Sequence, residues 1–146
     1  VSRTLDRNPL LSMAIGLVVT VMVQSSSITT SLLVPLAGAG LITLAQAFPV
    51  TVGANVGTTV TALIASLAVA GPNAVAGVTI ALVHLLFNLS ATVLIYPWKP
   101  VRNIPLYLAR RLAHVATESR WTALAYVGGV FYLLPGALAL LSRHFR

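Results

Sequence analysis

Seven of the nine residues from Val23 to Ser31, VQSSSITTS, carry uncharged polar side chains inside an otherwise apolar sequence. Hydroxyl and amide oxygens are ligands for hard cations such as sodium. Hydroxyl and amide hydrogens can be donated to an oxyanion. Because the sequence from Asn8 to Trp98 contains no Asp, Glu, Lys or Arg, these groups predict ion binding and not an enzyme's acid–base or nucleophilic catalysis.

A second polar cluster, TVGANVGTTVT, runs from Thr51 to Thr61. Two glycines, an asparagine and several threonines in an apolar segment are typical of a discontinuous membrane helix. The ends of a broken helix expose N–H groups that attract anions and carbonyl groups that attract cations. We therefore expect the two polar clusters to meet around one cavity in the membrane.

The charge inside such a cavity must be balanced by the ions themselves, because neither cluster contains a carboxylate. A lone charge at the centre of a bilayer costs about 2.5 kcal/mol or more. An anion and a sodium ion that enter together offset this cost for each other, which predicts cotransport. The alternative is that the Ser, Thr and Gly residues only pack membrane helices together.

The composition places the chain in a lipid bilayer. It is 58% hydrophobic with a mean hydropathy of +0.94, and only 8% of its residues are charged. All eleven charges precede Asn8 or follow Trp98. The net charge of +7 comes from basic residues that flank apolar segments. We interpret these residues as membrane-surface anchors and expect no nucleic-acid partner.

The predicted fold is an all-α integral membrane protein, a single transmembrane repeat domain over residues 1–146. The apolar arms on either side of QSSS are short for full crossings, which favours a re-entrant helical hairpin. An amphipathic pattern with arginines on one face predicts a helix in the membrane interface. The expected elements are a re-entrant hairpin at 8–44, a broken helix at 49–70 that opens at Pro49, a span at 74–96, the interfacial helix at 102–118, and a span at 121–141 with a kink at Pro135.

His84 and Asn88 are four residues apart and share one face of the 74–96 helix. They either hydrogen-bond within the helix bundle or face the substrate.

The segments QSSSITTSLLVPLAGAGLITLAQAFPVTVGANVGTTVTALIASLA, HLLFNLS, YP and RWTALAYV resemble the second QSSS repeat of the type II sodium-dependent phosphate cotransporters, a family with bacterial members. The resemblance runs from about Leu11 to Leu141. It implies an elevator-like transporter of sodium and inorganic phosphate, multi-pass in the bacterial inner (plasma) membrane. It also implies a partner, either a second QSSS repeat in the same parent chain or an inverted homodimer.

The resemblance also implies the site residues. Ala54 stands where we expect serine in animal members, a departure that puts one sodium ligand in doubt. We assign phosphate binding to Ser25, Ser26, Ser27, Asn55 and Thr58, and binding of the cotransported sodium ion to Gln24, Thr59 and Thr61. The alternatives are a sodium-coupled transporter of dicarboxylates or another oxyanion, and a non-transporting membrane assembly subunit.

The orientation in the membrane has two opposed predictions. By the positive-inside rule, the N-terminus and the interfacial helix lie on the cytoplasmic side, because they carry most of the Lys and Arg residues. The family resemblance implies the reverse, with the repeat beginning outside and ending in the cytoplasm.

Overall fold

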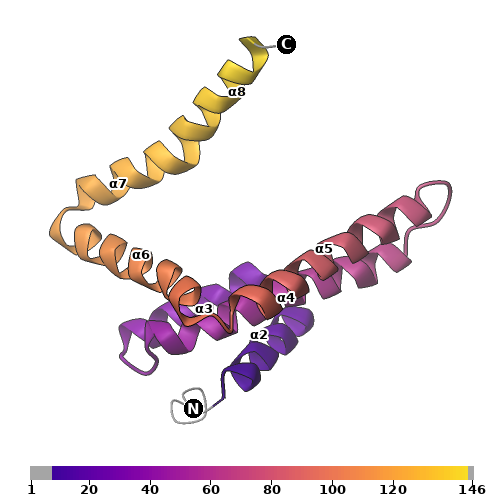
Figure 1. The fold of residues 1–146 in the computed structure, drawn as a ribbon, viewed down its shortest axis with the longest axis horizontal. Helices are drawn as coiled ribbons and strands as arrows, with labels where there is room; N and C mark the ends of the chain where they lie inside the picture. The colour runs from indigo at the N-terminus through magenta and orange to yellow at the C-terminus, as the bar shows by residue number, and fades with distance from the viewer. Residues whose placement is uncertain (1–7, 145–146) are drawn as a thin grey trace. The chain divides into compact units, whose positions relative to one another are not determined.

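The computed structural model describes residues 8–144, and within that range the secondary structure is helical with short turns (Figure 1). Contacts between residues divide the chain into two compact units, one ending at Arg102 and one beginning at Asn103. The predicted all-α class is therefore confirmed. The single repeat domain over residues 1–146 stays a prediction.

The QSSS segment forms the turn of a helical hairpin. Helix α2 spans Pro9–Val23, and it begins at Asn8, whose Oδ1 accepts hydrogen bonds from the N–H groups of Leu10 and Leu11 at 3.1 and 3.3 Å. It ends at Gln24, which has left-handed backbone angles (φ 59°). Ser25 then caps helix α3, Ser26–Gly38, by accepting a hydrogen bond from the Ile28 N–H at 3.3 Å. The prediction of two helices joined by a turn at QSSS is therefore confirmed.

The second arm of the hairpin ends at Gly38, before the predicted end at Leu44. Gly40 has a positive φ of 70°. Its N–H donates to the Ala37 carbonyl at 3.0 Å, and the Leu41 N–H donates to the Leu36 carbonyl at 2.9 Å. This pair of hydrogen bonds is a Schellman motif, which satisfies the last carbonyls and stops the helix.

Helix α4 spans Leu44–Leu67 without interruption, so the predicted broken helix at 49–70 is wrong. The helix starts ahead of Pro49 because Thr43 and Gln46 form a capping box. The Gln46 N–H donates to Thr43 Oγ1 at 3.3 Å, and the Thr43 N–H donates to Gln46 Oε1 at 2.6 Å.

The threonines of α4 do not open its backbone. Each hydroxyl donates to a carbonyl of the preceding turn, a side-chain bond that leaves the helix intact. The hydroxyl–carbonyl pairs are Thr51 to Ala47 (3.1 Å), Thr58 to Ala54 (3.2 Å), Thr59 to Val56 (2.7 Å) and Thr61 to Thr58 (2.8 Å).

The glycines of α4 lie at a close contact with α2. A Cβ on Gly53 would fall on the carbonyl oxygen of Met13, and a Cβ on Gly57 would lie 2.8 Å from Thr20 Cβ. Gly53 and Gly57 therefore form a GxxxG pair, which lets two helix backbones approach each other. The structural role of these glycines is helix packing and not helix breaking.

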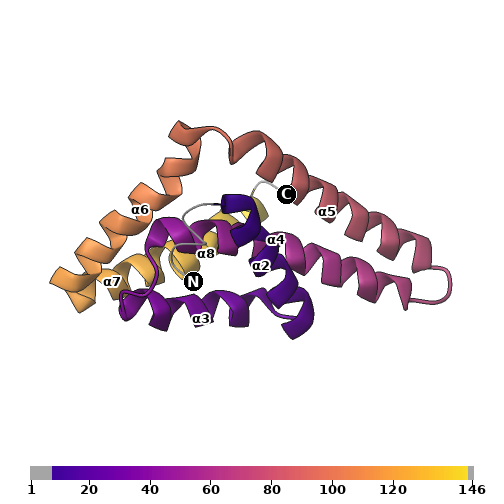
Figure 2. The ribbon, with the colours of Figure 1, turned by 90° about the horizontal axis from the view of Figure 1, so that it is seen from below.

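Helix α5, Ala74–Ile95, follows a turn at Gly71 (φ 88°) and lies beside α4 (Figures 1 and 2). It confirms the predicted helix at 74–96. Both α4 and α5 are long and apolar enough to cross a membrane. With 15 and 13 residues, α2 and α3 are about 22 and 20 Å long. Each is therefore shorter than a hydrocarbon core of about 30 Å.

Helix α6 spans Lys99–Glu118, close to the predicted range 102–118, and Arg111 Nε donates to the Tyr107 hydroxyl at 2.8 Å. Its place in the membrane interface stays a prediction.

The last predicted span is confirmed as a helical run long and apolar enough to cross a membrane, Arg120–Ser142. It consists of α7 (Arg120–Gly128), the π-helical turn η1 (Gly129–Leu133) and α8 (Leu134–His144). The Leu134 N–H donates to the Gly129 carbonyl. The π turn ends two residues before Pro135, which has no N–H to continue the α-helical pattern. The kink at Pro135 stays a prediction.

Candidate functional site

The QSSS hairpin and helix α4 share a pocket of about 360 Å³. Residues of both polar clusters therefore line one pocket, but α4 contributes no broken-helix end to it, and ion binding there stays a prediction. Its lining comes from α3 and α4: Ser26, Ser27, Thr30, Phe48, Thr51, Val52 and Asn55.

The α3 side of the pocket is the first turn of a helix. Ser26 and Ser27 are the first two helical residues, after the cap formed by Ser25. The N–H groups of a first turn point toward the N-terminal end of the helix, which is electropositive and favours anions. This turn therefore combines two hydroxyls with a favourable electrostatic position for an oxyanion.

Two other hydroxyls at the pocket are already committed as donors. Thr30 Oγ1 donates to the carbonyls of Ser26 and Ser27 at 2.9 and 3.2 Å, and Thr51 Oγ1 donates to the Ala47 carbonyl. A hydroxyl has one hydrogen to donate and two lone pairs. The oxygens of Thr30 and Thr51 can therefore still accept a hydrogen bond or coordinate a cation.

Asn55 connects the pocket to α5. Its Nδ2 donates to Asn88 Oδ1 at 3.2 Å, and Asn88 Nδ2 in turn donates to the His84 carbonyl at 3.2 Å. The interpretation that Asn88 hydrogen-bonds within the bundle is thus confirmed. We had not assigned Asn88 to the site. The sequence signal at this position is an amide in an apolar segment at helical spacing from His84, which does not identify its partner on α4.

The remaining predicted ligands lie outside the lining of this pocket. Gln24 Nε2 donates to the Val21 carbonyl at 3.0 Å, and Ser25 Oγ caps α3. The side chain of Thr59 is fully buried and bonded to Val56. The structure therefore brings Ser26, Ser27 and Asn55 together, and it does not bring the following residues to them: Gln24, Ser25, Thr58, Thr59 and Thr61.

Ala54 is fully buried at the contact with α2, where its backbone nitrogen would lie 3.0 Å from a Cβ on Gly16. A side chain at position 54 therefore lies in the contact between α4 and α2 and not in the pocket.

A buried hydrogen bond fixes the two arms of the hairpin. Thr20 Oγ1 on α2 donates to Thr29 Oγ1 on α3 at 3.0 Å, and Thr29 Oγ1 donates to the Ser25 carbonyl at 3.0 Å. The two side chains are 1% and 4% exposed, so water does not compete for this bond. It holds the cap residue of α3, and with it the pocket's first turn, against α2.

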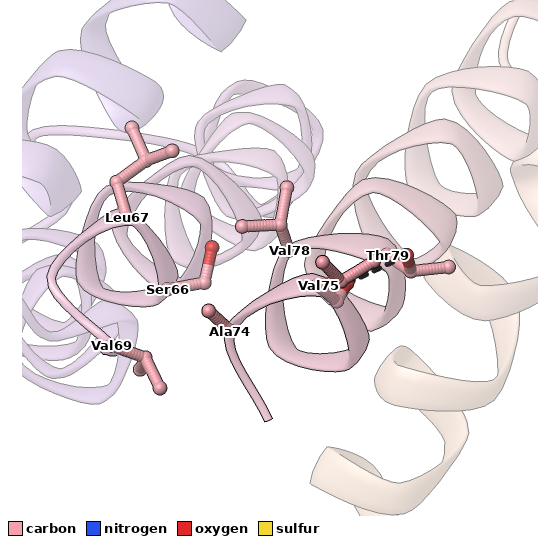
Figure 3. A pocket seen from close by; sticks show the side chains of 7 residues that line it. All are labelled: Ser66, Leu67, Val69, Ala74, Val75, Val78 and Thr79. Atoms are coloured by element: carbon pink, nitrogen blue, oxygen red, sulfur yellow. Dashed lines mark hydrogen bonds between the residues drawn. The ribbon is translucent and has the colours of Figure 1, made fainter. Parts of the chain in front are cut away.

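A second pocket, of about 340 Å³, lies where α4 ends and α5 begins (Figure 3). Figure 3 shows aliphatic side chains from the two helices and from the turn between them, among them Leu67 on α4, Val69 in the turn and Val78 on α5. Its two hydroxyls, Ser66 and Thr79, donate to carbonyls of their own helices, each at 2.7 Å. This largely apolar lining is unsuited to a pair of small ions.

Comparison with known proteins adds independent information. The sequence profile of a family described as Na+/Pi-cotransporter matches residues 1–109. The chain is 42% identical over 132 residues to sodium-dependent phosphate transport protein 2B of Bos taurus, an alignment that covers 90% of this chain and 19% of that protein. For the human protein 2B the identity is 42% over 125 residues, covering 86% of this chain and 18% of that protein.

The chain is also similar to sodium-dependent phosphate transport protein 2C of Mus musculus, with 41% identity over 132 residues, 90% of this chain and 22% of that protein. It therefore spans about a fifth of the length of these relatives. No solved structure matches the chain.

Proposed function

Since the chain belongs to the Na+/Pi-cotransporter family, as its motifs predict, we propose that it contributes one half of a sodium-coupled symporter of inorganic phosphate. The observation that carries this proposal is the pocket where Ser26 and Ser27 of the hairpin meet Thr51 and Asn55 of α4. Membership of this family supports a transport function, and the pocket has polar groups suited to both ions.

The proposed mechanism uses the two sides of the pocket differently. The electropositive first turn of α3 and its serine hydroxyls donate hydrogen bonds to phosphate oxygens. Oxygen atoms whose hydrogens are already donated, as in Thr30 and Thr51, coordinate sodium. Each ion lowers the electrostatic cost of the other, so the pair is bound and moved more readily than either ion alone.

We propose Ser25 and Thr58 as further phosphate ligands. We propose Gln24, Thr59 and Thr61 as sodium ligands. In the described conformation each of their hydroxyl or amide groups is bonded to its own segment or caps a helix. None of these residues lines the pocket, so their participation requires a rearrangement of the hairpin or of α4.

The proposed architecture is a re-entrant hairpin formed by α2 and α3, in an elevator-like transporter with two QSSS repeats. The lengths of the two helices support it, because neither reaches across a bilayer alone. The partner is a second QSSS repeat in the parent chain or an inverted copy. Location in a bacterial inner membrane belongs to the same proposal and rests on the resemblance to bacterial members, since the relatives named above are mammalian.

Uptake of labelled phosphate tests the proposal. The complete reading frame that encodes these residues is expressed, and uptake is measured in sodium chloride and in choline chloride. We expect uptake that requires sodium, is competed by arsenate and is insensitive to succinate. Ser26→Ala should lower it, whereas the matched variant Thr79→Ala, an exposed α5 threonine bonded to Val75, should not.

The rival functions give different results in this uptake assay and in measurements of stability and sodium binding. Competition by succinate but not arsenate would indicate a dicarboxylate transporter. If Ser26→Ala lowers protein stability and leaves sodium-dependent binding unchanged, the polar residues serve packing in a non-transporting assembly.

A further inference from the structure

The contact between α4 and α5 contains a directed chain of amide hydrogen bonds. Asn55 Nδ2 donates to Asn88 Oδ1, and Asn88 Nδ2 donates to the His84 carbonyl, each at 3.2 Å. Both helices are long and apolar enough to span a membrane. An amide without a hydrogen-bond partner is costly in hydrocarbon, which favours keeping these two hydrogen bonds.

The direction of the chain follows from the chemistry of its last acceptor. The backbone carbonyl of His84 can only accept, so Asn88 must turn its NH2 group toward it. Asn88 Oδ1 then faces α4, and Asn55 must present its own NH2 group. If the Asn55 amide were flipped, two amide oxygens would face each other, so the hydrogen-bond network fixes the orientation of this amide.

The remaining polar atom of Asn55 is an acceptor. Within residues 8–144, Oδ1 of Asn55 has no hydrogen-bond donor, and the residue lines the pocket shared by α3 and α4. An amide oxygen attracts a cation and repels the oxygens of phosphate. Thr51, which lines the same pocket, also offers its oxygen, because its hydrogen is bonded to Ala47.

We propose that Asn88 is a positioning residue that orients Asn55 so that Oδ1 coordinates the transported sodium ion. Asn55 then belongs to the sodium side of the pocket, which replaces the phosphate role assigned to it from the sequence. This inference rests on the proposed function in taking sodium as the cation. It adds a residue on α5 that acts through α4 without touching either ion.

The first test is binding of sodium alone, in the absence of phosphate. The protein from the complete reading frame is purified in detergent, and its thermal midpoint is followed as sodium chloride replaces choline chloride. Sodium should raise the wild-type midpoint. In Asn88→Ala the half-saturating sodium concentration should rise about 3- to 10-fold, the range for one lost hydrogen bond.

The pairing of the two residues gives a sharper prediction. Asn55→Ala should shift the half-saturating sodium concentration at least as far as Asn88→Ala, and the double variant should shift it no further than Asn55→Ala alone. Ser90→Ala is the matched control, because Ser90 lies on the same helix and its hydroxyl bonds only the Phe87 carbonyl, at 3.0 Å. Asn88→Ser is a second variant. The serine hydroxyl is too short to reach Asn55, so this variant should raise the half-saturating sodium concentration as Asn88→Ala does.

Transport kinetics separate positioning from a general structural role. At saturating sodium, the KM for phosphate should stay within about 2-fold of wild type in Asn88→Ala and Asn88→Ser. The inference is overturned by a raised phosphate KM with unchanged sodium dependence, by additive effects of the two asparagines, or by a wild-type protein that sodium does not stabilise. Sodium stabilisation without sodium-dependent phosphate uptake refutes the proposed function and leaves the role of Asn88 standing.

Discussion

Gly53 on α4 lies directly against the backbone of Met13 on α2, with no space for a Cβ between them. Gly16 on α2 has the reciprocal relationship with Val50, whose carbonyl oxygen would lie 2.0 Å from an added Cβ. Both obstacles are backbone atoms, which cannot rotate away as a side-chain end can. The contact therefore depends on glycine at both positions.

Gly53→Ala should destabilise the protein by about 1–3 kcal/mol, the usual cost of overpacking. Gly77→Ala is the control, because Gly77 lies in α5 and a Cβ there meets no atom within 4 Å. Thermal unfolding in detergent measures both. Equal midpoints for the two variants would contradict the close contact between α2 and α4.

Gly40→Ala should cost about 1 kcal/mol because Gly40 has a φ of 70° in the turn after α3. Its control is Gly38→Ala, at the last residue of α3, where an added Cβ meets no atom within 4 Å. Limited proteolysis between α3 and α4 gives a local measurement. Faster cleavage in the Gly38 variant than in the Gly40 variant would count against the Schellman turn.

Thr20→Val should lower stability by about 0.5–1.5 kcal/mol, since it removes the donor to Thr29 in a buried site while keeping the shape of the side chain. Thr79→Val is matched to it, because that threonine is exposed and bonds only its own helix. Chemical unfolding of the two variants should separate them. A loss no greater than in the Thr79 variant would show that the bond between the hairpin arms contributes nothing.

Thr59→Val tests whether a buried hydroxyl takes part in sodium binding. The isosteric change removes a hydroxyl that is bonded only to the Val56 carbonyl, so we expect a small change in stability. If Thr59 coordinates sodium in another conformation, as proposed, the half-saturating sodium concentration for phosphate uptake should rise about 3- to 10-fold. An unchanged concentration would restrict Thr59 to helix packing.

The hairpin could be predicted because its determinants are local. Asn8 before Pro9 and Ser25 at the turn are caps that act within a few residues of themselves. The end of α3 and the start of α4 were also encoded locally, by Gly40 and by the capping box of Thr43 and Gln46. We missed both because the apolar run from Ile28 to Leu44 suggested one continuous arm.

The continuity of α4 could not be derived from its own residues. A glycine pair such as Gly53 and Gly57 is compatible with a broken helix and with a close helix contact, and the choice depends on α2. The hydrogen bond from Asn55 to Asn88 is similar, because it joins residues 33 positions apart in sequence. The pocket could be anticipated from residue types, but the orientation of its amide required the packed helices.

The interlocked glycine backbones of α2 and α4 also limit how this part of the chain can move. There is no space for a Cβ at Gly16 or Gly53, so sliding one helix along the other would bring residues that carry side chains into a contact that cannot hold them. We therefore expect α2 and α4 to travel as one rigid body. Any opening or closing of the pocket would then fall to α3, and moving its first turn would require breaking the buried hydrogen bond between Thr20 and Thr29.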